Sequence, residues 1–156
     1  MREEKVESGL EMLLEKERIL DTVNDLFVGT DERDWARVAA ALAPRVHFDV
    51  RSMTGAAPET LEAAAIIARW TEGLRPLKAV HHQTGNFRVR VAGEEADVFC
   101  YATASHYLPN RSGRNSRVFI GSYDLHLTRQ AGAWRIDLFR FRLKYIDGNL
   151  DLENEG

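Results

Sequence analysis

The chain of 156 residues contains a single cysteine, Cys100, and no apolar run approaches the ~20 residues that a membrane-spanning helix needs. One cysteine excludes an internal disulfide, and its apolar surroundings are typical of a buried, inert thiol. The charged start MREEKVESG also lacks the apolar centre of a signal peptide. We therefore expect a cytoplasmic protein that does not associate with membranes.

Positive charge is not in excess, because 21 Lys and Arg residues stand against 24 Asp and Glu residues and the net charge is −3. A nucleic-acid partner is therefore not expected, since its binding face usually shows a basic excess. P-loop, Rossmann and serine-triad motifs are absent. The five histidines show no compact metal-ligand spacing such as H-x-x-x-H. We expect neither a cofactor nor a metal ion.

The composition, with 44% hydrophobic and 29% charged residues, is that of an ordinary globular protein. Its length fits one domain with a sizeable core. We place this domain at 9–146, between a flexible N-terminus at 1–8 and an acidic flexible tail at 147–156.

The first part of the domain is predicted to be helical. Apolar residues recur at helical spacing over 9–29, and Gly29 is typical of the C-terminal end of a helix. A shorter helix is expected over 33–43, with Asp31 or Asp34 as its N-cap.

Strands dominate the rest. The alternating segment VHFDVRSM predicts a strand over 46–53, and the alanine-rich segment ETLEAAAIIARWTEGL predicts a third helix over 59–74. Four further strands are expected over 79–91, 96–108, 117–129 and 134–146. This order predicts an α+β fold, in which three N-terminal helices close a cone-shaped, curved antiparallel sheet around an apolar cavity.

Two histidines and an upstream aspartate are candidates for proton transfer, because imidazole can both take and give a proton near neutral pH. His106 shares a strand face with small or apolar residues, so it is expected to point inward. His81 and His82 face opposite ways, so at most one of them lines a given cavity. Structural roles remain open: a core histidine bonded to a backbone carbonyl for His106, and a helix N-cap for Asp31.

The order of elements, with TDERDW before the second helix and GSYDLHLTRQAGAWRI near the end, resembles the NTF2-like superfamily and its SnoaL-like branch over about 10–146. Within that branch the chain most resembles the scytalone dehydratase family. The segments that carry this resemblance are TDERDWARVAAALAP, VHFDVRSM, VHHQTGN, ATASHYL and GSYDLH. The resemblance implies that Asp31, His82 and His106 are catalytic. It further implies that Ser122 and Asp124 contact the substrate.

The chain departs from the family at three positions. Thr30 and Val50 replace two tyrosines that hold a water against the substrate carbonyl, and Asp124 replaces an asparagine. The resemblance therefore favours related chemistry more than the same substrate, with Thr30 and Val50 still expected to contact it.

These features predict a cofactor-independent lyase of the dehydratase type, or an isomerase, acting on a small cyclic carbonyl compound. His106, with Asp31 as its partner, would move the proton, and His82 would orient the carbonyl. One alternative is a noncatalytic module that binds a small hydrophobic or aromatic ligand or serves as an accessory subunit. Another is an isomerase of the ketosteroid type that uses Asp124 with Tyr101 or Tyr123.

We interpret the strands at 96–108 and 134–146 as apolar on more than one side. Leaving such faces in water would expose a large apolar patch. We therefore expect a homodimer or homotrimer.

Overall fold

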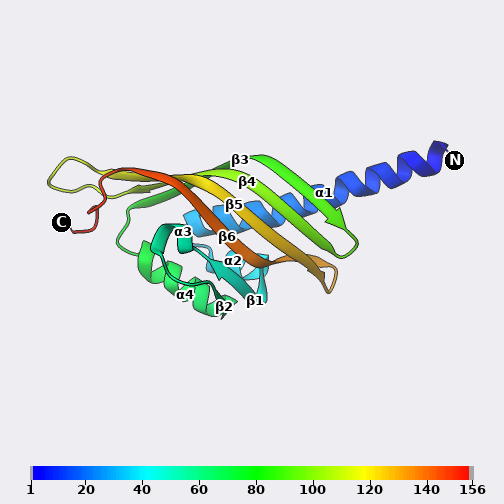
Figure 1. Ribbon diagram of the computed structural model, residues 1–156, viewed down its shortest axis with the longest axis horizontal. Coiled ribbons are helices and arrows are strands. Elements are labelled where there is room, and N and C mark those ends of the chain that lie inside the picture. The colour runs from blue at the N-terminus through cyan, green and yellow to red at the C-terminus, as the bar shows by residue number, and fades with distance from the viewer. Residues whose placement is uncertain (1, 155–156) are drawn as a thin grey trace.

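A computed structural model describes residues 2–154, with side chains from residue 6 onward. Within this range, helices and short strands alternate in the first half of the chain, and long strands make up the second half (Figure 1). The helices are α1 (Arg2–Glu32), α2 (Trp35–Ala41), α3 (Arg51–Thr54) and α4 (Ala63–Leu74). The strands are β1 (Leu42–Asp49), β2 (Glu59–Glu62), β3 (Ala79–Ala92), β4 (Glu95–Tyr107), β5 (Ser116–Gln130) and β6 (Ala133–Gly148).

The six strands form one curved sheet in the order β2-β1-β6-β5-β4-β3. The last four strands follow one another directly in the chain and pair antiparallel with their neighbours; two-residue turns connect β3 to β4 and β5 to β6, and a longer loop at 108–115 connects β4 to β5. The pair β1–β6 is parallel, with Phe48 opposite Phe139. The expected α+β fold with a curved sheet is therefore confirmed, although one of its strand pairs is not antiparallel.

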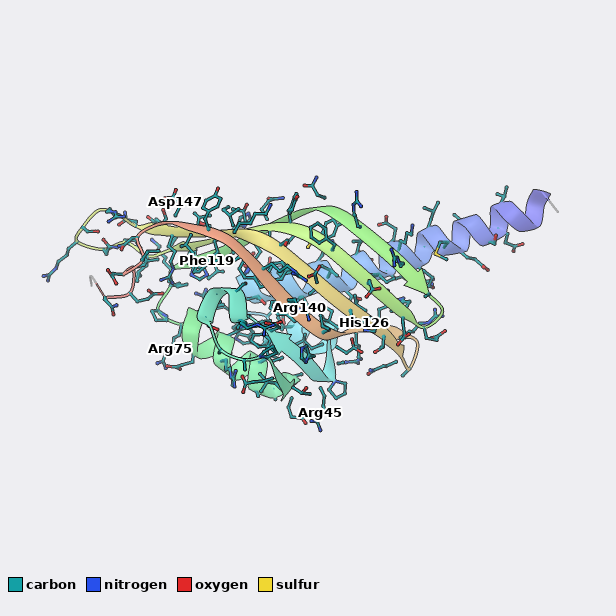
Figure 2. The ribbon with its side chains drawn as sticks, in the orientation of Figure 1. Arg45, Arg75, Phe119, His126, Arg140 and Asp147 are labelled. Carbon is teal, nitrogen blue, oxygen red and sulfur yellow. The ribbon has the colours of Figure 1, made fainter. Side chains whose placement is uncertain are left out.

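The helices cover one face of the sheet. Helix α1 contacts β3 and β6, and its N-terminal half extends beyond the sheet (Figure 1). Side chains fill the space between the layers, and Phe119 lies on the helix side of the strands whereas Asp147 lies on the outer side (Figure 2). The core is apolar and aromatic. Its fully buried members include Ile19, Val23, Leu26, Val38, Val46, Leu125, Leu127 and Ile136.

Helix α1 does not end at Gly29, as the sequence had suggested, but continues to Glu32. The glycine serves a different purpose, because a Cβ atom at this position would lie 3.0 Å from Val38 Cγ2. Gly29 therefore allows α2 to pack closely against α1. Of the two expected N-caps for α2, Asp34 is the one used, and its side chain accepts a hydrogen bond from the Arg37 backbone N at 3.1 Å.

Two boundaries in the middle of the chain also differ from expectation. The strand predicted over 46–53 begins earlier, at Leu42, and ends at Asp49, where α3 follows. The first four residues of the helix predicted over 59–74 instead form β2, which pairs antiparallel with β1 and places Leu61 opposite Val46. Pairing with the open edge of β1 outweighs the local helical preference of this segment.

Regular structure continues past the expected domain limits at both ends of the chain. Residues 2–8 belong to α1, and β6 continues to Gly148. Beyond β6, Leu152 is fully buried against Leu77 and Val80. The expected flexibility of both ends stays a prediction. Among the described helices, none is both long and apolar enough to cross a membrane.

Candidate active site

A cavity of about 190 Å³ lies between the C-terminal half of α1, α4 and the concave face of the sheet. Its walls are apolar and aromatic, and its hydroxyl and imidazole groups come from Thr30, Tyr123, His82 and His106. The remaining lining residues are Leu26, Phe27, Val50, Met53, Trp70, Leu74, Ala104, Phe119, Phe139 and Phe141. An apolar pocket with a few convergent polar groups is typical of a small-molecule site.

Strand β3 directs His82 into the cavity and leaves its neighbour His81 exposed. The last turn of α1 places Asp31 beside His82. One oxygen of Asp31 lies 2.6 Å from His82 Nδ1, and the other accepts a hydrogen bond from the His82 backbone N at 2.7 Å. Because Nδ1 is engaged by the carboxylate, Nε2 is the ring nitrogen left for the cavity.

Strand β4 directs His106 into the same cavity, on the face shared with Ala104 and Cys100. Its Nδ1 lies 3.1 Å from Nη2 of Arg117, which is the residue opposite His106 on β5. The sequence-based expectation paired Asp31 with His106, and the structure corrects it: Asp31 bonds to His82, and Arg117 bonds to His106.

Burial and the positive charge of Arg117 together lower the pKa of His106 to about 4. This imidazole is therefore neutral at pH 7. A guanidinium has only donors, so Nδ1 must accept its hydrogen bond and the ring proton must lie on Nε2. His106 thus offers an N–H donor to the cavity.

Thr30 and Val50, the two residues that replace the family tyrosines, both line the cavity. The Thr30 hydroxyl donates a hydrogen bond to the Leu26 carbonyl at 2.7 Å, within the same helix. Val50 precedes α3 and adds only apolar surface. Neither residue supplies the acidic hydroxyl that a tyrosine would bring to this wall.

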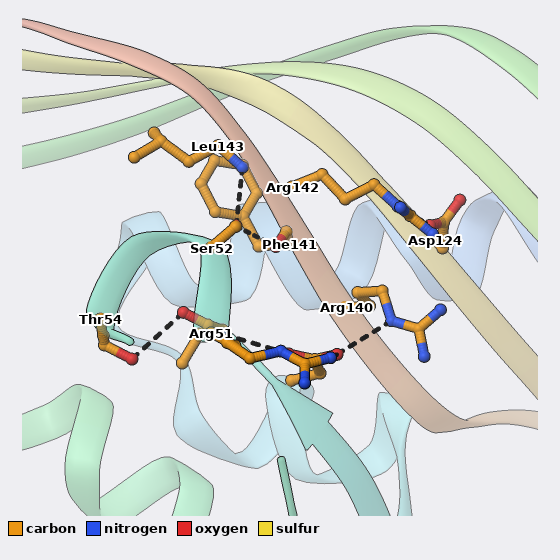
Figure 3. Close-up of polar contacts among 10 residues, drawn as sticks. Arg51, Ser52, Thr54, Asp124, Arg140, Phe141, Arg142 and Leu143 are labelled. Carbon is orange, nitrogen blue, oxygen red and sulfur yellow. Dashed lines mark hydrogen bonds and ion pairs between the residues drawn. The ribbon is translucent and has the colours of Figure 1, made fainter. Parts of the chain in front are cut away.

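Ser122 and Asp124 do not lie where the resemblance implied. Strand alternation directs Tyr123 into the cavity and both of its neighbours to the outer face. There Asp124 Oδ2 accepts a hydrogen bond from Arg142 Nε at 2.5 Å, a pair shown in Figure 3. Tyr101 is also on the outer face, beneath the Lys144 ammonium. Tyr123 is thus the only one of these candidates that lines the cavity.

Sequence reasoning missed how α3 completes the cavity. Ser52 Oγ donates to the Phe141 carbonyl at 2.7 Å and accepts from the Leu143 backbone N at 2.9 Å (Figure 3). These bonds hold α3 against β6 and so place Met53 at the cavity wall. Interpreting 46–53 as one continuous strand concealed this contact.

Aromatic rings pack around Tyr123, whose ring centroid lies 4.8 Å from that of Phe27, 5.1 Å from that of Phe139 and 4.9 Å from that of Phe141. Burial raises the pKa of the Tyr123 hydroxyl well above its ordinary value, so the phenol stays protonated. Phe139 and Phe141, both on β6, line the cavity as well.

Burial also raises the pKa of the Cys100 thiol, to about 12, as expected for an unreactive core cysteine. Among residues 2–154, no three His, Cys, Asp or Glu side chains come together as a potential metal site.

Several solved structures share this fold. One is the Kfla4162 protein from Kribbella flavida, with 20% identity, a TM-score of 0.83, and coverage of 89% of this chain and 96% of that chain. Another is a type 2 hexachlorocyclohexane dehydrochlorinase, LinA, with 17% identity, a TM-score of 0.76, and coverage of 90% of this chain and 93% of that chain. A protein from Novosphingobium aromaticivorans, provisionally named a scytalone dehydratase, has 17% identity, a TM-score of 0.76, and coverage of 88% of this chain and 89% of that chain.

The comparison with curated protein sequences found no match. The sequence model of the SnoaL-like domain matches residues 11–140, which include α1 from its third turn onward and most of the sheet. The chain therefore belongs to the SnoaL-like family, within the NTF2-like fold.

Proposed function

We propose that this protein is a cofactor-independent lyase or isomerase that removes a proton from carbon next to the carbonyl group of a small cyclic compound. The observation that carries this proposal is the contact of Asp31 with His82 Nδ1, at 2.6 Å, at the wall of an apolar cavity. It is the arrangement that a general base needs: a ring nitrogen facing the substrate, and a carboxylate behind the ring.

In this mechanism His82 is the base. Asp31 holds the proton of the neutral ring on Nδ1, so the lone pair of Nε2 faces the substrate. When Nε2 takes the substrate proton, the ring becomes positively charged, and the carboxylate stabilises that charge. The protonated ring then returns the proton to another carbon in an isomerisation, or to the leaving group in an elimination.

His106 supplies the second role, that of a hydrogen-bond donor. Its Nε2–H would bind the substrate oxygen on which negative charge develops. Because its pKa is lowered to about 4, the ring stays neutral and keeps this single proton on the cavity side at neutral pH. These assignments reverse the roles that the sequence alone had suggested for the two histidines.

The cavity favours a small, uncharged substrate. Its described lining residues include no Lys, Arg, Asp or Glu, and aromatic rings form much of the wall. Such a surface suits an apolar ring better than an anion. The names of two structures with this fold, a dehydrochlorinase and a provisional dehydratase, both describe eliminations and agree with this class of reaction.

Proton exchange tests this proposal without knowledge of the natural substrate. Small uncharged cyclic ketones are incubated with the protein in D2O, and loss of their α-proton signals is followed by NMR. We expect at least one ketone to exchange faster than in buffer alone, and His82→Gln to reduce that rate by ~100-fold or more.

His81→Gln is the matched control, because His81 is the exposed neighbour on the same strand. Its exchange rate should equal that of the parent protein. Buffer-level exchange for every ketone would overturn the proposal. Ketone binding without exchange would instead favour the alternative of a noncatalytic ligand-binding module.

A further inference from the structure

The segment after β6 is anchored close to His106. Leu152 is fully buried in a small cluster with Leu77 and Val80. At the start of the segment, the backbone N of the buried Asn149 donates to the Ser116 carbonyl at 2.9 Å. These contacts place the segment against β3 and β5, and the residue next to Leu152 is Glu153.

Glu153 binds Arg117 through both carboxylate oxygens. Nη1 of Arg117 lies 2.9 Å from Oε2 of Glu153, and Nη2 is hydrogen-bonded to Oε1. The guanidinium also lies over the Phe119 ring, 5.4 Å from its centroid, and the Arg117 side chain is only 14% exposed. These contacts hold the guanidinium in place while Nη2 donates to His106 Nδ1.

We propose that Arg117 and Glu153 are positioning residues that keep the proton of His106 on Nε2, where it faces the cavity. This inference rests on the proposed function, in which that N–H binds the substrate oxygen. An imidazole without such a partner can carry its proton on either nitrogen, and the molecules with Nδ1–H would lack the donor. A guanidinium at Nδ1 removes this alternative because it cannot accept a hydrogen bond.

The charges around His106 explain why an arginine paired with a glutamate suits this task. Arg117 on β5 and His82 on β3 lower the pKa of His106, whereas Glu153 and Asp31 raise it, and burial is the largest cause of the lowered value. Glu153 therefore offsets part of the positive charge of Arg117. The pair can orient the ring without placing a strong uncompensated charge behind the cavity.

Long-range proton–nitrogen NMR of the histidine rings tests the inference directly. In the parent protein at pH 7, we expect His106 Nδ1 to resonate as an unprotonated nitrogen and Nε2 as a protonated one. His106→Gln identifies the signals. Arg117→Met removes the donor but keeps an apolar stem, so the two nitrogen signals should move toward each other and the pKa of His106 should rise.

Arg114→Met is the matched control, since Arg114 lies in the preceding loop and donates to the Gly148 carbonyl. It should leave the His106 signals unchanged. Glu153→Gln is a second, milder variant, because it leaves Arg117 in place. It should move the signals in the same direction as Arg117→Met, by a smaller amount.

Unchanged His106 signals in both variants, or a parent protein with the proton on Nδ1, would overturn the inference. These measurements need no substrate, so their failure is distinct from failure of the proposed function, which ketone exchange decides. Where a ketone does exchange, Arg117→Met should lower kcat roughly tenfold or more with little change in KM. An unchanged kcat would also contradict the assigned role.

Discussion

Asp31 binds both the ring and the backbone of His82, through its two carboxylate oxygens. The backbone bond fixes the end of α1 against β3, and the ring bond sets the orientation of the imidazole. One carboxylate therefore joins two elements of the fold and defines the direction of the proposed base. Both side chains are about seven-eighths buried, with exposed fractions of 13% for Asp31 and 12% for His82, which limits competition from water.

The contact between Asp31 and His82 predicts the effect of Asp31→Asn. The amide keeps the shape of the carboxylate but lacks the charge that stabilises a protonated ring. We expect ketone exchange to fall by ~100-fold or more. Asp34→Asn is the control, because asparagine is an equally good N-cap for α2 and the exchange rate should not change. Equal exchange rates for the two variants would remove Asp31 from the mechanism.

The lowered pKa of His106 predicts a dependence of stability on pH. Its pKa is about 4 in the folded protein and about 6.5 in an unfolded chain, so the unfolded state binds more protons between these values. The free energy of unfolding should therefore fall as the pH drops from 6.5 to 4, by up to roughly 3 kcal/mol from this residue. Urea unfolding at several pH values measures the slope, and His106→Ala should flatten it. A parent slope that persists in His106→Ala would assign the effect to other groups.

Gly121 on β5 is predicted to be essential for close packing against β6. A Cβ atom at this position would lie 2.3 Å from the Arg142 carbonyl oxygen and 2.8 Å from the Phe141 ring. Gly121→Ala should destabilise the protein by about 1–3 kcal/mol or more, because the rigid sheet cannot make room. Gly73→Ala is the contrast: Gly73 lies within α4 in open space, and alanine there should stabilise by about 0.5–1 kcal/mol. Thermal unfolding compares the two, and equal melting temperatures would contradict this account.

The outer position of Asp124 predicts that it is dispensable for activity. Asp124→Asn and Ser122→Ala should leave the exchange rate within twofold of the parent rate. A twofold change corresponds to about 0.4 kcal/mol in the activation free energy. The partner of Asp124, Arg142, has a side chain that is 60% exposed, so loss of this ion pair should cost less than about 1 kcal/mol. A large loss of activity in a folded variant would show that these residues do contribute to the active site.

We also expect a homodimer or homotrimer. The outer face of the sheet exposes aromatic side chains, with Tyr101 45% exposed on β4 and Tyr145 57% exposed on β6. Burying such rings between copies of the chain would stabilise an assembly. Light scattering at micromolar concentration gives the mass, and a value near the 17.7 kDa of one chain would contradict the expectation.

The sequence was sufficient to predict the long strands and the inward face of β4. The alternation of side chains placed His106 beside Ala104 and Cys100, and all three point inward. The same alternation could have corrected the positions taken from the family resemblance. Tyr123 shares a strand face with the buried Leu125, so its neighbours Ser122 and Asp124 had to face the other way.

Which groups meet could not be predicted in the same way. Asp31 and His82 are 51 positions apart, and Arg117 and Glu153 are 36 positions apart. Their contacts depend on strand register and on how α1 and the C-terminal segment pack. Periodicity reports which face a side chain occupies, but it carries no information about which distant residue lies beside it.

The parallel pairing of β1 with β6 has a consequence for biosynthesis. Phe48 on β1 meets Phe139 on β6, so one partner leaves the ribosome roughly 90 residues before the other. Until then, β1 can pair only with β2, and α1 and α2 lack their contacts with β6. Such distant pairing slows folding and prolongs the exposure of apolar surface. We therefore expect the nascent chain to depend on chaperones until the last strand is complete.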